Sequence, residues 1–141
     1  MSLPRRADST DDAALGAPDD SGDGYILIVD DDPGISDLVA MVLRDEEGYA
    51  VELASTLRQV LSRPPERAPR MVFLDATLPG ENVLQTSADL RRLPGWRETP
   101  IVLCSGRDDI ARMAREMDAA AYLKKPFDLD DLIALAGAYA R

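Results

Sequence analysis

The segment Tyr25–Pro33 reads YILIVDDDP, which is five apolar or aromatic residues followed by three aspartates and a proline. A short apolar run bounded by turn-forming residues is typical of a buried strand. An aspartate directly before a proline is a common helix start, because the carboxylate caps the helix and proline fits its first position. We therefore predict a strand that ends in acidic residues, with Asp32 as the N-cap of the helix that follows.

The same alternation of strand and helix continues along the chain. After the opening strand, apolar residues recur at helical spacing at Ile35, Leu38, Val39, Val42 and Leu43. Further strands are expected at Ala50–Leu53, Met71–Leu74, Ile101–Cys104 and Ala121–Leu123. Further helices are expected from Leu57, at Glu81–Arg92, at Asp108–Met117 and at Asp128–Tyr139. Because successive parallel strands need right-handed crossovers, this order predicts an α/β fold: a doubly wound (βα)5 flavodoxin-like parallel sheet with strand order 2-1-3-4-5.

Residues 1–24 differ from the rest of the chain in composition. They contain six aspartates among glycine, proline, serine and alanine, with few large apolar side chains. Such a segment buries too little apolar surface to offset the entropy of ordering. We expect a disordered acidic tail at residues 1–24 and one folded domain at residues 25–141.

Composition excludes several classes of function. The net charge of -10 disfavours direct binding to nucleic acid or to an anionic membrane surface, and no apolar run is long enough to cross a bilayer. The chain has no histidine, so any chemistry must use other side chains. Cys104 is the only cysteine and lies in an apolar run, where core packing is expected. These features, with no apolar stretch after Arg5 and Arg6, predict a cytoplasmic protein.

Polar residues stand where four of the expected strands end. They are Asp30 with Asp31, Asp75, Ser105 and Lys125. In a doubly wound sheet these strand ends meet near the ligand-binding crevice. Crowded carboxylates repel one another and either resist ionising or bind a cation. An all-oxygen ligand set predicts Mg2+.

This grouping suggests phosphoryl transfer to a carboxylate. Asp75 would be the acceptor, because transfer needs mainly in-line positioning and positive charge around the phosphoryl oxygens. Mg2+ and Lys125 would supply that charge, and the Ser105 hydroxyl would donate to one phosphoryl oxygen.

Four motifs in order resemble a bacterial response-regulator receiver domain of two-component signal transduction. They are Ile26 to Asp32 (ILIVDDD), Phe73 to Gly80 (FLDATLPG), Val102 to Gly106 (VLCSG) and Tyr122 to Phe127 (YLKKPF). The resemblance covers Tyr25–Arg141 and implies that Asp75 is the phosphoacceptor. It implies that the metal site comprises Asp30, Asp31, Asp75 and the backbone carbonyl of Thr77, with Asp30 acting through water.

The resemblance also implies a read-out of phosphorylation. Ser105 and Lys125 would contact the phosphoryl group, with Ser105 and Tyr122 as the switch residues and a cis Lys125–Pro126 bond. The surface formed by the fourth helix, fifth strand and fifth helix would then change. The implied partners are a sensor histidine kinase or phosphotransfer protein, and a second copy or an output domain at that surface. Such a domain catalyses only its own phosphorylation and dephosphorylation.

Other interpretations stay open. One alternative role for Asp30 and Asp31 is helix capping alone, and for Asp75 and Ser105 it is turn formation. The alternative for Lys125 is a solvated charge, and for Tyr122 it is packing at a sheet edge. A haloacid-dehalogenase-like phosphatase needs a second aspartate where this chain has Thr77. A phosphorylation-independent docking module usually lacks part of the acidic and lysine set. A dinucleotide-binding domain is disfavoured because no G-x-G-x-x-G follows the first strand.

Overall fold

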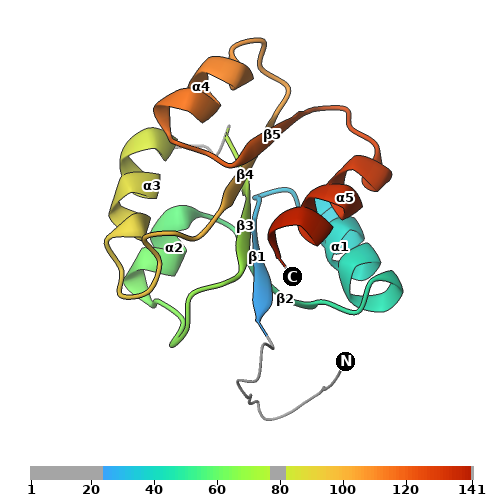
Figure 1. Cartoon of the computed structure of the whole chain (residues 1–141), viewed down its shortest axis with the longest axis horizontal. Coiled ribbons are helices and arrows are strands. Elements are labelled where there is room, and N and C mark those ends of the chain that lie inside the picture. The colour runs from blue at the N-terminus through green and yellow to red at the C-terminus, as the bar shows by residue number, and fades with distance from the viewer. Residues whose placement is uncertain (1–23, 77–81, 141) are drawn as a thin grey trace.

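The computed structural model describes residues 24–76 and 82–140. Within these residues, five parallel strands form one sheet in the order β2-β1-β3-β4-β5 (Figure 1). The strands are β1 Tyr25–Val29, β2 Ala50–Ala54, β3 Met71–Asp75, β4 Ile101–Ser105 and β5 Ala121–Lys124. The doubly wound α/β fold and the strand order predicted from the sequence are confirmed.

Helices cover both faces of the sheet. On one face lie α1 Pro33–Met41 and α5 Leu129–Tyr139, and on the other lie α2 Leu57–Ser62, α3 Val83–Arg91 and α4 Ile110–Glu116 (Figure 1). None of the helices in the described ranges is long and apolar enough to cross a bilayer. The prediction of a disordered tail at residues 1–24 falls, except for Gly24, outside the described residues.

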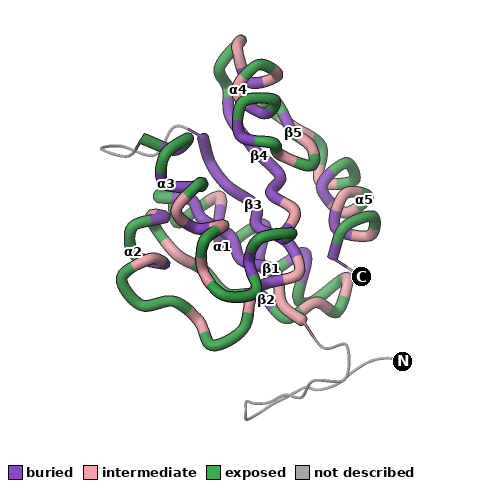
Figure 2. The backbone as a smooth tube through the Cα atoms, turned by 60° about the vertical axis from the view of Figure 1, so that its left-hand side comes forward, coloured by how far each residue is buried: buried purple, intermediate pink, exposed green. Residues whose placement is uncertain are grey.

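The core consists of two layers, one on each face of the sheet. Successive strand side chains point to opposite faces, so each strand contributes to both layers. Leu27, Val29, Val72 and Leu74 pack with the layer of α2, α3 and α4, whereas Ile26, Ile28, Met71 and Phe73 pack with α1 and α5. Strands β3 and β4 are buried along their whole length and β1 is buried after Tyr25 (Figure 2), as expected for a parallel sheet covered on both faces.

Helix α1 begins as the sequence predicts. The Asp32 carboxylate accepts hydrogen bonds from the backbone N–H groups of Gly34, at 3.0 Å, and Ile35, at 3.4 Å, and Pro33 occupies the first turn. The capping role of Asp32 is confirmed. Helix α1 therefore needs no cap from Asp30 or Asp31.

The end of this helix differs from the prediction. After α1 the chain continues as a π-helical turn, η2 Val42–Glu46, and then reverses at Gly48, whose φ of 79° favours glycine. Leu38, expected on the buried stripe, is 47% exposed. The buried stripe is centred on Val39 and Leu43, and Leu38 lies about 100° around the helix from Val39, at the solvent margin.

Candidate functional site

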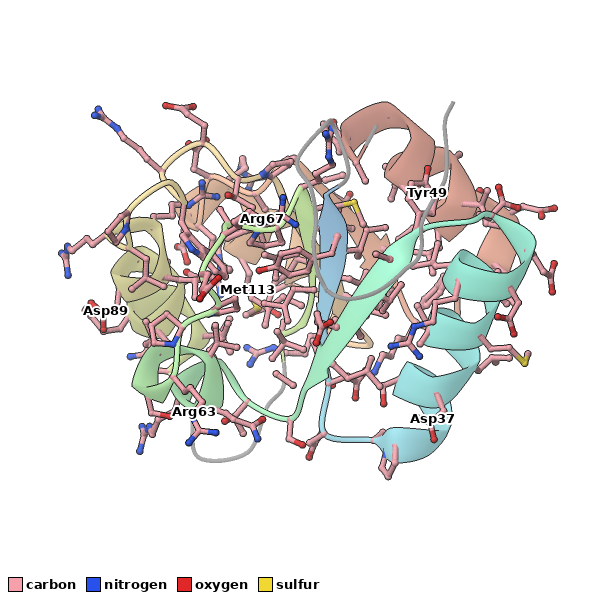
Figure 3. All side chains as sticks on the ribbon, turned by 90° about the horizontal axis from the view of Figure 1, so that it is seen from below. Asp37, Tyr49, Arg63, Arg67, Asp89 and Met113 are labelled. Atoms are coloured by element: carbon pink, nitrogen blue, oxygen red, sulfur yellow. The ribbon has the colours of Figure 1, made fainter. Side chains whose placement is uncertain are left out.

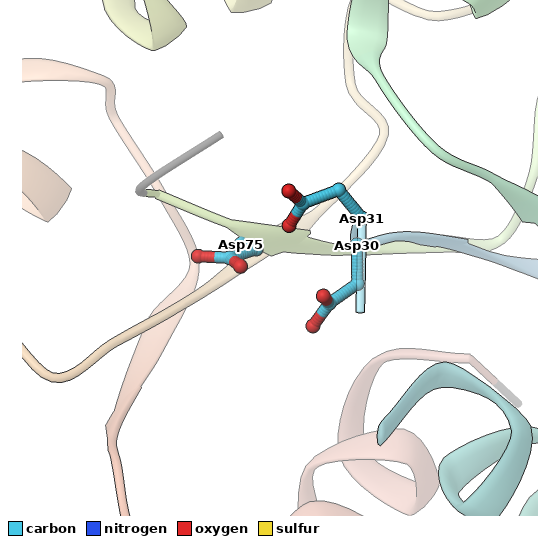
Figure 4. A group of neighbouring side chains, drawn as sticks. All are labelled: Asp30, Asp31 and Asp75. Atoms are coloured by element: carbon cyan, nitrogen blue, oxygen red, sulfur yellow. The ribbon is translucent and has the colours of Figure 1, made fainter. Parts of the chain in front are cut away.

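Three carboxylates meet at the carboxyl ends of β1 and β3. These strands are hydrogen-bonded neighbours in which Val29 pairs with Leu74. Asp30 directly follows β1, and Asp75 is the last residue of β3. One oxygen each from Asp30, Asp31 and Asp75 lies within 4.8 Å of the others (Figure 4). The predicted convergence of these three side chains is confirmed.

The three carboxylates differ in exposure. Asp30 and Asp75 are buried, at 3% and 4% exposure, whereas Asp31 is exposed at the rim. Burial disfavours a charged carboxylate unless a cation or hydrogen bonds compensate for the lost water. The site therefore needs positive charge at its inner end.

Lys125 supplies part of this charge. Its Nζ lies 3.5 Å from Asp75 Oδ2 and 3.8 Å from Asp30 Oδ2. The Lys125 backbone N–H donates to the Ser105 carbonyl at 2.8 Å, which fixes the end of β5 beside the end of β4. The Lys125–Pro126 bond is cis, as expected.

The electrostatics of the pocket follow from burial and crowding. Burial raises the pKa of Asp30, and the nearby Asp75 adds to this effect against the opposing hydrogen bond from Asp32. Burial of the Lys125 ammonium acts to lower its pKa, but attraction by Asp75 and Asp30 outweighs this and raises the pKa. The lysine is therefore firmly protonated, and Asp30 resists ionisation when no further cation is bound.

The carboxylate of Asp30 has one unsatisfied oxygen. Its Oδ1 accepts a hydrogen bond from the Asp32 backbone N–H at 2.8 Å. Its Oδ2 is buried and has no hydrogen-bond partner among the described residues. A buried acceptor in this state, within a group of three carboxylates, is suited to a hard divalent cation or its bound water. The donor set fits Mg2+.

Ser105 is the last residue of β4 and is fully buried. Its Oγ accepts a hydrogen bond from the Arg107 backbone N–H at 3.0 Å. Ser105 thus lies at a strand end beside β3 and β5, and its hydroxyl proton is not committed to that bond.

Tyr122 lies on β5 and is 46% exposed. It lines a shallow groove of about 610 Å³ with residues of α4 such as Ala111 and Ala114. The predicted switch residues Ser105 and Tyr122 therefore lie on neighbouring strands. Thr77, the predicted backbone ligand, lies outside the described residues.

Two features of the site were not predicted. A second groove, of about 240 Å³, extends from Asp30 and Asp31 past Ser55 and Gln59 toward α1. The other site residues were identified as polar residues at strand ends. Strand β2 ends at Ala54, so this criterion did not point to the second groove. In addition, Lys124, which is half exposed, donates to Asp108 in the connection before α4.

Cys104 has no part in this chemistry. It is fully buried in the core between β3 and β5, and burial raises the pKa of its thiol to about 12. It therefore stays a thiol at neutral pH, and the core-packing interpretation is confirmed.

Comparison with known proteins gives a consistent result. A family model described as the response regulator receiver domain matches residues 26–136. The nitrogen assimilation regulatory protein NtrX of Azorhizobium caulinodans is 36% identical over 114 residues, covering 78% of this chain and 24% of that protein. The transcriptional regulatory protein KdpE of Mycobacterium tuberculosis is 33% identical over 118 residues, covering 82% of this chain and 50% of that protein. This chain therefore spans half or less of the length of these relatives.

Among solved structures, the chemotaxis protein CheY4 of Vibrio cholerae superposes with a TM-score of 0.73. Its sequence identity is 23%, and the match covers 82% of this chain and 98% of that chain. At this identity the likeness shows the fold alone.

Proposed function

The chain belongs to the response regulator receiver domain family of two-component systems, and we propose that it is a phosphorylation-dependent switch whose acceptor is Asp75. One observation carries this proposal. Asp75 is buried at the end of β3, groups with Asp30 and Asp31, and lies 3.5 Å from the ammonium of Lys125. The site thus combines a nucleophilic oxygen with positive charge for the incoming anion.

In the proposed reaction, a carboxylate oxygen of Asp75 attacks the phosphorus of a phosphohistidine or of acetyl phosphate. An acyl–phosphate bond forms as the bond from phosphorus to the donor nitrogen or oxygen breaks, and the bonding electrons leave with the donor. Little covalent help is needed, so the chain acts mainly by positioning and by charge. It is a signalling phosphoacceptor rather than a conventional enzyme.

Asp30, Asp31 and Asp75 would hold Mg2+, together with the backbone carbonyl of Thr77. When bound, Mg2+ supplies positive charge to the transferring phosphoryl oxygens. Lys125 binds a second phosphoryl oxygen by moving from the carboxylates that it already contacts. The Ser105 hydroxyl donates to a third oxygen, because its proton is not used in the hydrogen bond that it accepts from Arg107.

The read-out we propose passes through Ser105 to Tyr122. A phosphoryl group adds strong acceptor oxygens at the strand ends, and the Ser105 side chain turns toward them. Tyr122 then turns inward and changes the surface of α4, β5 and α5. The partners are a sensor histidine kinase or a phosphotransfer protein, and a second copy or an output domain that recognises the changed surface.

Treatment with acetyl phosphate, followed by measurement of the mass of the intact protein, tests Asp75 as the phosphoacceptor. Wild-type protein should gain the mass of one phosphoryl group with Mg2+ and none with EDTA. Asp75→Ala should gain none in either case. Asp45→Ala, which removes an exposed carboxylate of η2, is the matched control and should behave as wild type. A phosphorylated Asp75→Ala protein would refute the assignment of the acceptor.

A further inference from the structure

The connections at the amino ends of β3 and β4 carry a cluster of arginines that the proposed switch does not use. We name as the arginine surface the side chains of Arg63, Arg67, Arg70, Arg92 and Arg97. All are exposed except Arg70, which is half-buried (Figure 3 labels Arg63 and Arg67). Arg70 precedes β3, whereas Asp75 ends it, so this surface lies at the opposite end of the strand from the carboxylate site.

The two connections pack against each other, which brings their charges together. A Cβ placed on Gly95 would lie 3.9 Å from the Ala68 side chain. Arg91, on the last turn of α3, donates to the carbonyl of Arg97 at 3.3 Å and supports the second connection. Residues 63–70 and 91–98 contain six arginines and two glutamates. Arg92 is partly neutralised, because its guanidinium pairs with Asp89 of α3 at 2.7 Å. The other arginines leave the surface basic on a chain whose net charge is -10.

Gly24 and Tyr25, which follow the acidic N-terminal segment in sequence, contact this surface. The Arg70 backbone N–H donates to the Tyr25 carbonyl at 2.8 Å, and the Tyr25 hydroxyl donates to the Arg67 carbonyl at 2.5 Å. The Arg70 side chain lies directly against Gly24, because a Cβ there would come within 2.2 Å of it. Asp19, Asp20 and Asp23 precede Gly24 by one to five residues. At about 3.5 Å per residue they can lie no farther than roughly 18 Å from it.

We infer that Asp19, Asp20 and Asp23 bind the arginine surface of the same chain. A tethered segment of this length has an effective concentration in the millimolar range, which favours it over a separate acidic partner. The overall acidity of the chain disfavours nucleic acid as the occupant. The contact would shield the arginine surface from other acidic partners, and a partner would have to displace it. This inference goes beyond the proposed switch and does not depend on phosphorylation.

The test compares two full-length triple variants that change the net charge equally. The near variant carries Asp19→Asn, Asp20→Asn and Asp23→Asn, which neutralise the three acids closest to Gly24. The distant variant carries Asp8→Asn, Asp11→Asn and Asp12→Asn, which neutralise three acids farther along the chain. Backbone amide shifts of residues 63–70 and 92–98 are recorded from about 0.01 M to about 1 M salt, where the Debye length falls from about 30 Å to about 3 Å. The near variant should show at low salt the amide positions that wild type reaches only at high salt. The distant variant should follow wild type.

A synthetic peptide spanning residues 17–24 gives a second readout. It should bind the near variant several-fold more tightly than wild type, in which the surface is already covered. Adding Arg67→Gln and Arg97→Gln to the near variant should abolish this binding, whereas adding Arg112→Gln and Arg115→Gln on α4 should leave it unchanged. Equal amide changes in both triple variants, or equal peptide binding by wild type and near variant, would overturn the inference.

Discussion

Lys124 and Lys125 are adjacent, are the only lysines of the chain, and each contacts aspartate, yet their surroundings differ. Alternate residues of a strand end point in opposite directions, so Lys124 turns outward to Asp108 and Lys125 turns inward to Asp75 and Asp30. Asp108 is almost fully exposed, whereas the two partners of Lys125 are almost fully buried. Water and salt screen the outer pair and leave the inner group strongly coupled.

This difference shows that the distance between two charged groups does not by itself give the strength of their interaction. The outer contact, between Lys124 and Asp108, is shorter than either contact of Lys125, but it joins two solvated groups. The inner contacts are longer and involve carboxylates that have lost their water. We therefore expect chemistry and coupling in the inner group, and little effect from the outer pair.

The largest effect is expected from removing the inner lysine. Lys125→Met leaves buried carboxylates without their counter-charge, which should lower the free energy of unfolding by about 1–3 kcal/mol at neutral pH in EDTA. Mg2+ should recover part of this loss, because it supplies the missing charge. Urea unfolding with and without Mg2+ measures both effects. Lys124→Met is the matched control, and an equal loss in that variant would contradict the distinction between the two lysines.

The second prediction separates the acids of the site from the helix cap. Asp31→Ala should weaken Mg2+ binding by about tenfold, equivalent to roughly 1.4 kcal/mol, because it removes a charged ligand. Asp32→Ala should leave Mg2+ affinity nearly unchanged and instead lower stability by about 1 kcal/mol through loss of the cap. Calorimetric titration with Mg2+ measures the affinities. A stronger effect on Mg2+ affinity from Asp32 than from Asp31 would show that the roles are reversed.

The third prediction concerns how stability changes with pH. The change should have one sign for the inner group around Lys125 and the opposite sign for the outer pair of Lys124 and Asp108. The pKa of Asp30 is raised by burial, so its contribution to stability is present at low pH and is lost as pH rises from about 4 through the raised pKa. The pKa of Asp108 is lowered by its hydrogen bond to Lys124, so its contribution is present above about pH 4 and is lost as pH falls through the lowered pKa.

Unfolding curves of Asp30→Asn and Asp108→Asn, recorded in EDTA across this range, test the two signs. Asp30→Asn should gain stability relative to wild type as pH rises, by about 1.4 kcal/mol for each unit by which the pKa is raised. Asp108→Asn should lose its small difference from wild type as pH falls. Parallel curves for wild type and Asp30→Asn would contradict the electrostatic account of the inner group.

The smallest effect is expected at Ser105, which pairs with Lys124 across β4 and β5 and follows Cys104, the neighbour of Asp75 on β3. Its hydroxyl accepts from Arg107, whose guanidinium pairs with Asp109 in the exposed connection. Ser105→Ala should still accept phosphate on Asp75 but show smaller amide shift changes in residues 107–117 and 121–139. If its changes on phosphorylation equalled those of wild type, Ser105 would not relay the signal.

The inner group was predictable because it depends on chain order alone. Parallel strands place their carboxyl ends together, so Asp30, Asp75 and Lys125 could be grouped once their strands were recognised. Their contacts are confirmed, whereas the roles given to Asp75 as acceptor and to Tyr122 as switch stay predictions.

The features that sequence missed depend on geometry that side-chain type does not encode. The Lys124–Asp108 contact joins residues 16 positions apart through the path of an exposed connection. The exposure of Leu38 depends on how α1 is rotated against the sheet, which a stripe of apolar residues fixes only approximately. The π-helical end of α1, η2 Val42–Glu46, is composed of residues that also occur in ordinary α-helices.

The buried position of Trp96 has a practical consequence for measurements on this protein. Trp96 is the only tryptophan of the chain, is 2% exposed, and packs in the core layer of α2, α3 and α4, in the connection before β4. The carboxylate site lies at the opposite ends of the strands. Intrinsic fluorescence excited at the indole therefore reports the opening of that layer, with a red shift when water reaches the ring. It is a clean optical signal for unfolding, and occupancy of the distant pocket must be followed with a probe placed there.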